Sequence, residues 1–184
     1  MTSDEFIAWA VEQPEGARYE LVRGEVVATA SDRVGHWRVK ARVVRLFNEA
    51  IERAALECEI FSDRVAVEVS DHTVYEPDAM VRCGAPVPDD TAKIVDPVVV
   101  VEVLSPSTGA HDAGAKLEDY FEMPSVRHYL LVNARTRTVI HHVRAENGEI
   151  ATRIARGGAV RLDPPGIVLD VADLFLGLKG DAAR

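Results

Sequence analysis

Several features are scarce in this 184-residue chain, and each scarcity excludes a class of protein. No apolar run reaches the roughly 20 residues that a membrane-spanning helix needs. The first residues, Met1 to Glu5, lack the basic start of a secretory signal. No glycine-rich phosphate loop follows a strand pattern, which argues against a dinucleotide-binding fold. We therefore expect a cytoplasmic protein with no membrane segment.

Cysteine is also scarce, because Cys58 and Cys83 are the only two. They share no metal-ligand spacing. We expect each to be a small buried hydrophobic residue in a reducing compartment.

Basic residues are outnumbered, with 21 Lys and Arg against 30 Asp and Glu, so the formal net charge is −9. This balance argues against indiscriminate binding of polyanions. One segment departs from it, since residues 33–45 contain no acid. The basic residues of this island are Arg33, Arg38, Lys40, Arg42 and Arg45.

The length and ordinary composition predict one globular domain over residues 1–184. Paired strand patterns at 19–29 and 138–152 predict an N-terminal and a C-terminal β-hairpin. The order of elements predicts an α/β (α+β) fold, with helices flanking one mixed central sheet. We expect helices over 2–10, 34–55, 111–122 and 171–176, and strands over 19–22, 25–29, 59–62, 65–69, 78–82, 98–104, 127–132, 138–143 and 148–152.

The helix expected over 34–55 has an apolar row of Val34, Trp37, Ala41 and Val44. A second row beside it holds Val43, Phe47 and Ala50. His36 stands near the start of this helix and could contact a phosphate or a carboxylate. On another face Arg38, Arg42 and Arg45 follow one another at helical spacing. These arginines form either a solvated face, which the pattern favours, or a track for nucleic-acid phosphates.

Two carboxylates stand out within strand patterns. Glu102 lies in the β-branched run Val98 to Leu104, where an ionised side chain is rare unless a metal or another cation compensates for lost hydration. Asp78 follows Pro77 at the head of another strand. On neighbouring strands the two could hold one Mg²⁺ or Mn²⁺. Otherwise Asp78 is a turn residue and Glu102 faces solvent on a half-exposed strand.

Two further residues could serve such a site. Lys116 could orient an attacking water or offset charge in the transition state, although an exposed pair with Asp112 one helical turn earlier is the simpler interpretation. Glu20 is either an exposed strand residue or another site acid.

Other candidates are set aside. His141 and His142 alternate across a strand, so they cannot both face one site. Ser105 and Ser107 have no His and Asp pattern that would support a nucleophile.

A set of motifs in a fixed order resembles the Uma-two family of restriction-endonuclease-like proteins, of the DUF820 type. The resemblance covers the core of the chain, about residues 4–175. Together the motifs are quite specific, whereas each one alone is weak. They are Tyr19-Glu-Leu-Val-Arg-Gly-Glu-Val, Glu76-Pro-Asp, Val101-Glu-Val-Leu-Ser-Pro-Ser-Thr, Asp112-Ala-Gly-Ala-Lys116, Tyr120 and His128-Tyr-Leu-Leu-Val132.

The resemblance implies the PD-(D/E)xK nuclease fold, which has a mixed central sheet flanked by helices and a Mg²⁺-dependent site. It implies that Asp78 and Glu102 bind the metal and that Glu20 is the acid contributed by the N-terminal region. The general motif has a lysine two residues after the second acid, where this chain has Leu104. Lys116, on the following helix, resembles the relocated lysine known in this superfamily.

These observations predict a Mg²⁺- or Mn²⁺-dependent endodeoxyribonuclease that hydrolyses phosphodiester bonds of DNA. Asp78, Glu102, Lys116 and Glu20 are its expected catalytic residues. We expect a homodimer, because cutting both strands of a duplex favours two-fold symmetry. Two alternatives remain open: a catalytically silent nucleic-acid-binding or interaction module with the same fold, and a hydrolase of small phosphodiesters.

Overall fold

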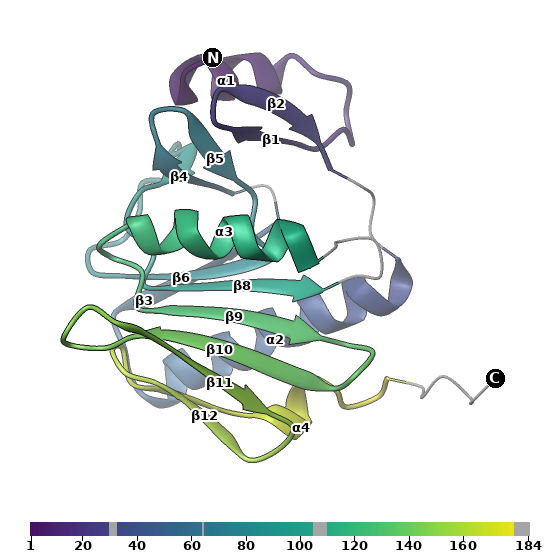
Figure 1. The fold of residues 1–184 in the computed structure, drawn as a ribbon, viewed down its shortest axis with the longest axis vertical. Helices are drawn as coiled ribbons and strands as arrows, with labels where there is room; N and C mark the ends of the chain where they lie inside the picture. The colour runs from purple at the N-terminus through teal and green to yellow at the C-terminus, as the bar shows by residue number, and fades with distance from the viewer. Residues whose placement is uncertain (30–32, 64, 105–109, 179–184) are drawn as a thin grey trace.

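The computed structural model describes residues 1–29, 33–63, 65–104 and 110–178, and at residues 110–113 it describes the backbone alone. The strands in these ranges form a six-stranded, a five-stranded and a two-stranded sheet. In Figure 1 the five-stranded sheet lies at the top, and helix α3 crosses in front of the six-stranded sheet while helix α2 lies behind it. The expected central mixed sheet with flanking helices is confirmed.

The six-stranded sheet is built around β8 (Val99–Leu104). Strand β8 runs parallel to β9 (His128–Asn133) and antiparallel to β6 (Ala79–Cys83). The connection from β8 to β9 contains α3 (Ala110–Glu122). Valines 99 to 101 are buried, as a β-branched run between two covered faces predicts. The outer strands are β3 (Cys58–Ser62) beside β6, and β10 (Thr138–Arg144) followed by β11 (Ile150–Ala155) beside β9.

The N-terminal hairpin of β1 (Tyr19–Val22) and β2 (Glu25–Ala28) lies in a separate, five-stranded sheet. Helix α1 (Ser3–Val11) precedes it, and Thr2 and Glu5 form a capping box at its start. The expectation of one sheet was too simple, because three short strands complete this second sheet. They are β4 (Ala66–Ser70), β5 (Thr73–Tyr75) and β7 (Lys93–Ile94), in the order β2-β1-β5-β4-β7.

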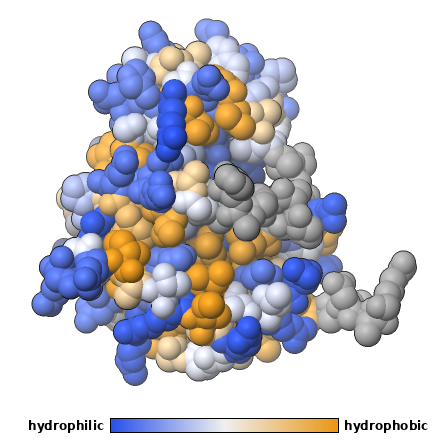
Figure 2. Space-filling model, viewed as in Figure 1, coloured by the Kyte–Doolittle hydropathy of each residue, from blue (hydrophilic) through white to orange (hydrophobic). Residues whose placement is uncertain are grey.

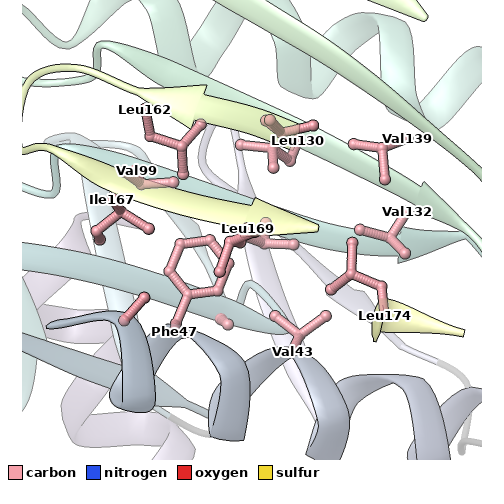
Figure 3. Close-up of a cluster of buried hydrophobic side chains, with 14 of the residues drawn as sticks. Val43, Phe47, Val99, Leu130, Val132, Val139, Leu162, Ile167, Leu169 and Leu174 are labelled. Carbon is pink, nitrogen blue, oxygen red and sulfur yellow. The ribbon is translucent and has the colours of Figure 1, made fainter. Parts of the chain in front are cut away.

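Helix α2 (Val34–Arg53) packs its buried face on the six-stranded sheet. A further hairpin, β12 (Ala159–Leu162) and β13 (Ile167–Asp170), with the short helix α4 (Val171–Leu174), covers the same face. Figure 3 shows Val43 and Phe47 of α2 beneath Leu169 of this hairpin. This hairpin is absent from the predicted strands, and Asp170 at its end caps α4 through the N–H of Ala172.

One prediction about α2 is wrong. Val34 and Trp37 of the first apolar row are 65% and 58% exposed. The core stripe instead begins at Val39 and continues through Val43 and Phe47. These three side chains recur at four-residue spacing, so they form one continuous ridge against the sheet, and Trp37 points away from it.

The prediction of two free cysteines is also wrong, because Cys58 and Cys83 form a disulfide. The two residues are direct partners in the antiparallel register of β3 and β6, and their Cα atoms are 3.9 Å apart. Strand pairing, rather than spacing along the chain, brings them together. The bond removes the argument for a reducing compartment that rested on free thiols.

No helix within the described ranges is long and apolar enough to cross a membrane. On the face shown in Figure 2, hydrophobic residues lie in several spots among hydrophilic ones.

Candidate active site

The candidate site lies at the C-terminal end of β8, beside the early turns of α2 and α3 (Figure 1). The register of β6 and β8 pairs Ala79 with Val101. Continued by one residue, it sets Asp78 opposite Glu102. The backbone N–H of Val103 donates to Asp78 Oδ2 at 2.6 Å, which fixes this carboxylate against the edge of β8. The expectation that the two acids lie on neighbouring strands is therefore met.

Glu102 faces α3. Lys116 Nζ lies 3.2 Å from Glu102 Oε1, and the Tyr120 hydroxyl donates to the same oxygen at 3.2 Å. Burial raises the pKa of Glu102 to about 7; the ammonium of Lys116 opposes this rise, and the carboxylates of Asp78 and Glu20 add to it. Burial and the Glu102 carboxylate also raise the pKa of Tyr120, so its hydroxyl stays a donor. The single ammonium group of Lys116 therefore does not fully compensate for the burial of Glu102 beside two other carboxylates.

Lys116 is not on a solvated face, because it is only 8% exposed. Its Nζ lies 2.7 Å from Glu20 Oε1 and over the Tyr75 ring, 4.8 Å from the centroid. Glu20 Oε1 also accepts from the backbone N–H of Glu76 at 3.2 Å. The five-stranded sheet thus supplies an acid to a site on the six-stranded one. The alternative partner, Asp112, has a side chain outside the described part of the chain.

A second lysine belongs to the site, and the sequence analysis assigned it only to the basic island. Lys40 on α2 is 2% exposed. Its Nζ lies 2.9 Å from Asp78 Oδ1 and 2.5 Å from Asp63 Oδ1. The helical signal was present, because Lys40 sits next to Val39 and one turn before Val43 and Val44, on the core side of α2. The inward position of Lys40 was missed because the apolar row that contains Val34 and Trp37 is the more prominent pattern in this helix.

His36 also reaches the site. Its Nε2 hydrogen-bonds to the carbonyl oxygen of Val103 and lies 3.7 Å from Asp78 Oδ2. The sequence analysis expected a contact with phosphate or with a catalytic carboxylate, and in this structure His36 lies beside the carboxylate. Since a carbonyl oxygen only accepts, Nε2 carries the proton.

The three arginines lie elsewhere on α2. Arg42 Nη2 donates to the carbonyl oxygen of Leu176 at 2.9 Å, and Arg45 pairs with Glu49 at 2.6 Å. Together with Arg38 they line a surface groove on the outer side of the helix. They are not part of the carboxylate site. Ser105 and Ser107 lie outside the described residues.

The donor set suits a hard divalent cation. We call Glu20, Lys40, Asp78, Glu102 and Lys116 the charged cluster. Its three carboxylates and that of Asp63, when all are ionised, exceed its two ammonium groups by two negative charges. No three His, Cys, Asp or Glu side chains among those described already surround one ion position. Two carboxylates with water and phosphate oxygens are, however, how Mg²⁺ is commonly held.

The fold and this cluster first define a class. A mixed sheet flanked by helices, with two opposed acids and a lysine, is the restriction-endonuclease-like arrangement that the motifs implied. A crystal structure from Anabaena variabilis ATCC 29413, described as a "putative nuclease belonging to DUF820", has the same fold. It matches with a TM-score of 0.75 at 17% identity, over 95% of this chain and 97% of that one.

The chain belongs to the Uma2 family, described as "Putative restriction endonuclease", which matches residues 3–172. The resemblance drawn from the motifs is therefore confirmed. Two uncharacterized proteins of Synechocystis sp. (strain ATCC 27184 / PCC 6803 / Kazusa) are similar to it. Protein slr1290 is 28% identical over 150 residues, which are 81% of this chain and 77% of that protein. Protein sll1609 is 26% identical over 133 residues, covering 71% and 75%. Nuclease-like function is supported at this level.

Proposed function

We propose that this chain is a Mg²⁺- or Mn²⁺-dependent endonuclease that hydrolyses phosphodiester bonds of DNA. One observation carries the proposal: Asp78 and Glu102 are opposed across β6 and β8, with Lys116 against Glu102. Membership of a restriction-endonuclease family gives the general reaction class.

Asp78 and Glu102 would hold the cation. Such an ion lowers the pKa of a bound water and stabilises negative charge on a phosphate. Lys116 would orient the hydrolytic water through its N–H groups and offset charge at the phosphate. Glu20, 2.7 Å away, fixes the direction of the Lys116 ammonium group. Lys40 and the Val103 N–H hold Asp78, so both oxygens of this carboxylate have defined positions.

The direct test replaces the two acids. Asp78→Asn and Glu102→Gln keep the shape of each side chain and remove its charge. We expect each variant to lose plasmid nicking and linearisation with Mn²⁺ by at least about a hundredfold, because each would lose a ligand that the transition state needs. Asp90→Asn, in an exposed loop, is the matched control and should cleave normally. Undiminished cleavage by either site variant would rule out this assignment.

A second candidate function has one observation in its favour. Lys40 and Lys116 already bind oxygens of Asp78 and Glu102, and Leu104 occupies the usual lysine position. A catalytically silent nucleic-acid-binding or interaction module would keep these ion pairs permanently. Calorimetric titration separates the two candidates: heat of Mn²⁺ binding that disappears in Glu102→Gln supports the nuclease, and no heat at millimolar Mn²⁺ supports the silent module. Cleavage of a small phosphodiester but not of DNA would point to the third possibility.

Two further parts of the proposal concern assembly and location. A homodimer would place two sites on the two strands of a duplex. Equilibrium sedimentation of the full chain tests this, and a monomer at all concentrations would contradict it.

The proposal of a cytoplasmic location is now supported only by the proposed DNA substrate, because Cys58 and Cys83 form a disulfide and no longer indicate a reducing compartment.

A further inference from the structure

A groove of about 270 Å³ lies on the outer side of α2, opposite the ridge that packs in the core. Trp37, Ala41 and the arginines line one side, and residues 176–178 line the other. Trp37 is 58% exposed, which is unusual for so large an apolar side chain. It is one of two tryptophans in the chain. The bond from Arg42 to the Leu176 carbonyl ties the two sides together. We call this site the Trp37 groove.

The charge around the Trp37 groove is positive in a chain of net charge −9. No acidic residue occurs in α2 between Val34 and Asn48. Arg38 and Arg45 border the groove. Arg45 is paired with Glu49, but both side chains are about half exposed, and such pairs are weak enough to exchange for a phosphate. The surface is therefore complementary to an anion that also carries an apolar, flat group.

The Trp37 groove and the charged cluster lie on different sides of the first turns of α2. His36 and Lys40 reach Asp78 from one side of these turns. Trp37, next to His36, and Ala41, next to Lys40, face the groove. Neighbouring helical residues differ by 1.5 Å along the axis and about 100° around it. A polymer that runs round the start of α2 can thus contact both sites.

We propose that the Trp37 groove binds an unpaired base of the DNA substrate on the outer side of α2, with the base stacked on Trp37 and flanking phosphates against Arg38 and Arg45. This inference rests on the proposed nuclease function and narrows its substrate to DNA with single-stranded or extruded bases. Within a duplex both faces of a base are covered by its neighbours, so only an unpaired base offers a free face to the indole. The groove volume is at the lower end for ligand pockets, about 300 Å³, which suits one ring system.

Tryptophan fluorescence in EDTA tests the proposal without cleavage. In Trp9→Phe the only remaining tryptophan is Trp37, and the replaced ring lies in α1, remote in sequence from the groove. We expect a single-stranded oligodeoxynucleotide, or a duplex with a one-base bulge, to quench this fluorescence. A blunt duplex of the same sequence should quench it much less. Equal quenching by blunt duplex and single strand would overturn the proposal.

Substitutions then separate stacking from charge. Trp37→Ala should weaken single-strand binding about tenfold or more, measured by anisotropy of a labelled oligonucleotide, and Trp37→Phe should restore most of it. Val34→Ala removes an equally exposed apolar side chain of α2 outside the groove and should change nothing. Arg38→Ala should reduce the slope of log affinity against log salt by about one, and exposed Arg53→Ala should not. Unchanged affinity in Trp37→Ala would refute the base site.

Failure of this proposal is distinguishable from failure of the nuclease proposal. If Trp37 is quenched by single strands but no Mn²⁺-dependent cleavage occurs, the base site stands and the nuclease assignment fails. If DNA is cleaved but Trp37→Ala binds and cleaves bulged DNA normally, the nuclease stands and the base site is wrong. A dimer that dissociates in Trp37→Ala, with no effect of DNA on the fluorescence, would show that a second copy fills the groove and would also overturn the proposal.

Discussion

The charged cluster and a group of three histidines are both buried at the six-stranded sheet, the first between this sheet and its neighbours and the second within it, and their burial is compensated differently. We call His128, His141 and His142 the histidine cluster. Its members hydrogen-bond to one another or to other residues of the same chain. His128 Nδ1 lies 2.9 Å from His141 Nε2, and His128 Nε2 lies 2.9 Å from the carbonyl oxygen of Pro164. Because a carbonyl only accepts, His128 is protonated at Nε2 and its Nδ1 accepts from His141. His128 and His141 thus satisfy one another as neutral rings, and His142, on the other face of β10, bonds to Thr152.

The charged cluster, by contrast, brings together acidic and basic side chains from five segments of the chain. Its acids come from β1, from the residue before β6 and from β8, and its lysines come from α2 and α3. Burial lowers the pKa of His128, His141 and His142, which favours their neutral forms, whereas the pKa of Glu102 rises to about 7 beside other carboxylates. A group that exists only for structure is most stable when neutral. Perturbed ionisable groups of this kind are concentrated at functional sites, and this supports the proposal that the charged cluster is the active site.

The largest effect that distinguishes the charged cluster from the histidine cluster is expected for Lys40→Met. The substitution leaves the buried Asp78 carboxylate without the Lys40 ammonium, and breaking a buried pair costs about 3–5 kcal/mol. Urea denaturation in EDTA should show this loss, and Mn²⁺ should restore more stability to the variant than to the wild type.

Lys93→Met is the matched control for Lys40→Met. Lys93 also pairs with two acids, Asp4 and Glu68, but it lies on the more exposed face of β7. We expect a loss of about 1 kcal/mol and no rescue by Mn²⁺. Equal losses in the two variants would mean that the charged cluster is an ordinary ion-pair network.

The histidine cluster should respond to acid. Burial, with a smaller contribution from His128, lowers the pKa of His141 to about 4 from an ordinary value near 6.5. The unfolded chain then takes up a proton before the folded one does, so stability is complete above pH 6.5 and is lost as pH falls toward 4. The loss from this group amounts to at most about 3 kcal/mol.

The variant His141→Gln keeps an N–H donor for His128 and cannot take up that proton. Its free energy of unfolding, followed by urea denaturation between pH 7 and pH 4, should fall less steeply than that of the wild type. His72→Gln, which replaces an exposed histidine, should keep the wild-type slope. If His141→Gln also keeps that slope, His128 and His141 are not a neutral pair.

A smaller effect is expected from Glu20→Gln. The variant keeps the hydrogen bond to the Glu76 N–H but loses the charge that holds Lys116. Cleavage should fall about tenfold, whereas Mn²⁺ affinity should change little, since Glu20 is not proposed as a ligand. Glu25→Gln, an exposed acid on the partner strand β2, is the control and should have normal activity. A large loss of Mn²⁺ affinity in Glu20→Gln would make Glu20 a metal ligand instead.

Most of the charged cluster was predictable because its acids stand out against local patterns. Glu102 interrupts a run of valines, and Asp78 heads a strand that pairs with it. The role of Lys116 came only from the family motifs, since periodicity alone favoured a surface position. Lys40 was missed because a lysine on a helix is usually exposed. Its burial depends on a rotation of α2 that the prominent but exposed Trp37 obscured.

The disulfide and the second sheet were not predictable for a related reason. Cys58 and Cys83 meet through strand register, which local sequence does not specify. Strand β7 has two residues, Lys93 and Ile94, and is defined by its parallel partner β4 rather than by its own pattern. Long-range pairing determines these features, whereas periodicity determines α2 and the hairpins.

The smallest effect should come from Tyr120→Phe, which tests whether the two clusters are independent. Tyr120 donates to Glu102, and its ring packs on Tyr129, with centroids 5.1 Å apart. Tyr129 in turn stacks on His142 at 5.9 Å, so one row of aromatic rings links the charged cluster to the histidine cluster. Tyr120→Phe removes the hydroxyl and keeps the ring.

We expect Tyr120→Phe to lose about 1 kcal/mol of stability, the net value of one hydrogen bond, and to cleave DNA a few times more slowly. The pKa of His142, followed by NMR, should match that of the wild type, because the ring contacts with Tyr129 remain. A shifted pKa of His142 would show that its protonation depends on the environment of Glu102. The aromatic row would then couple two regions that the hydrogen bonds keep separate.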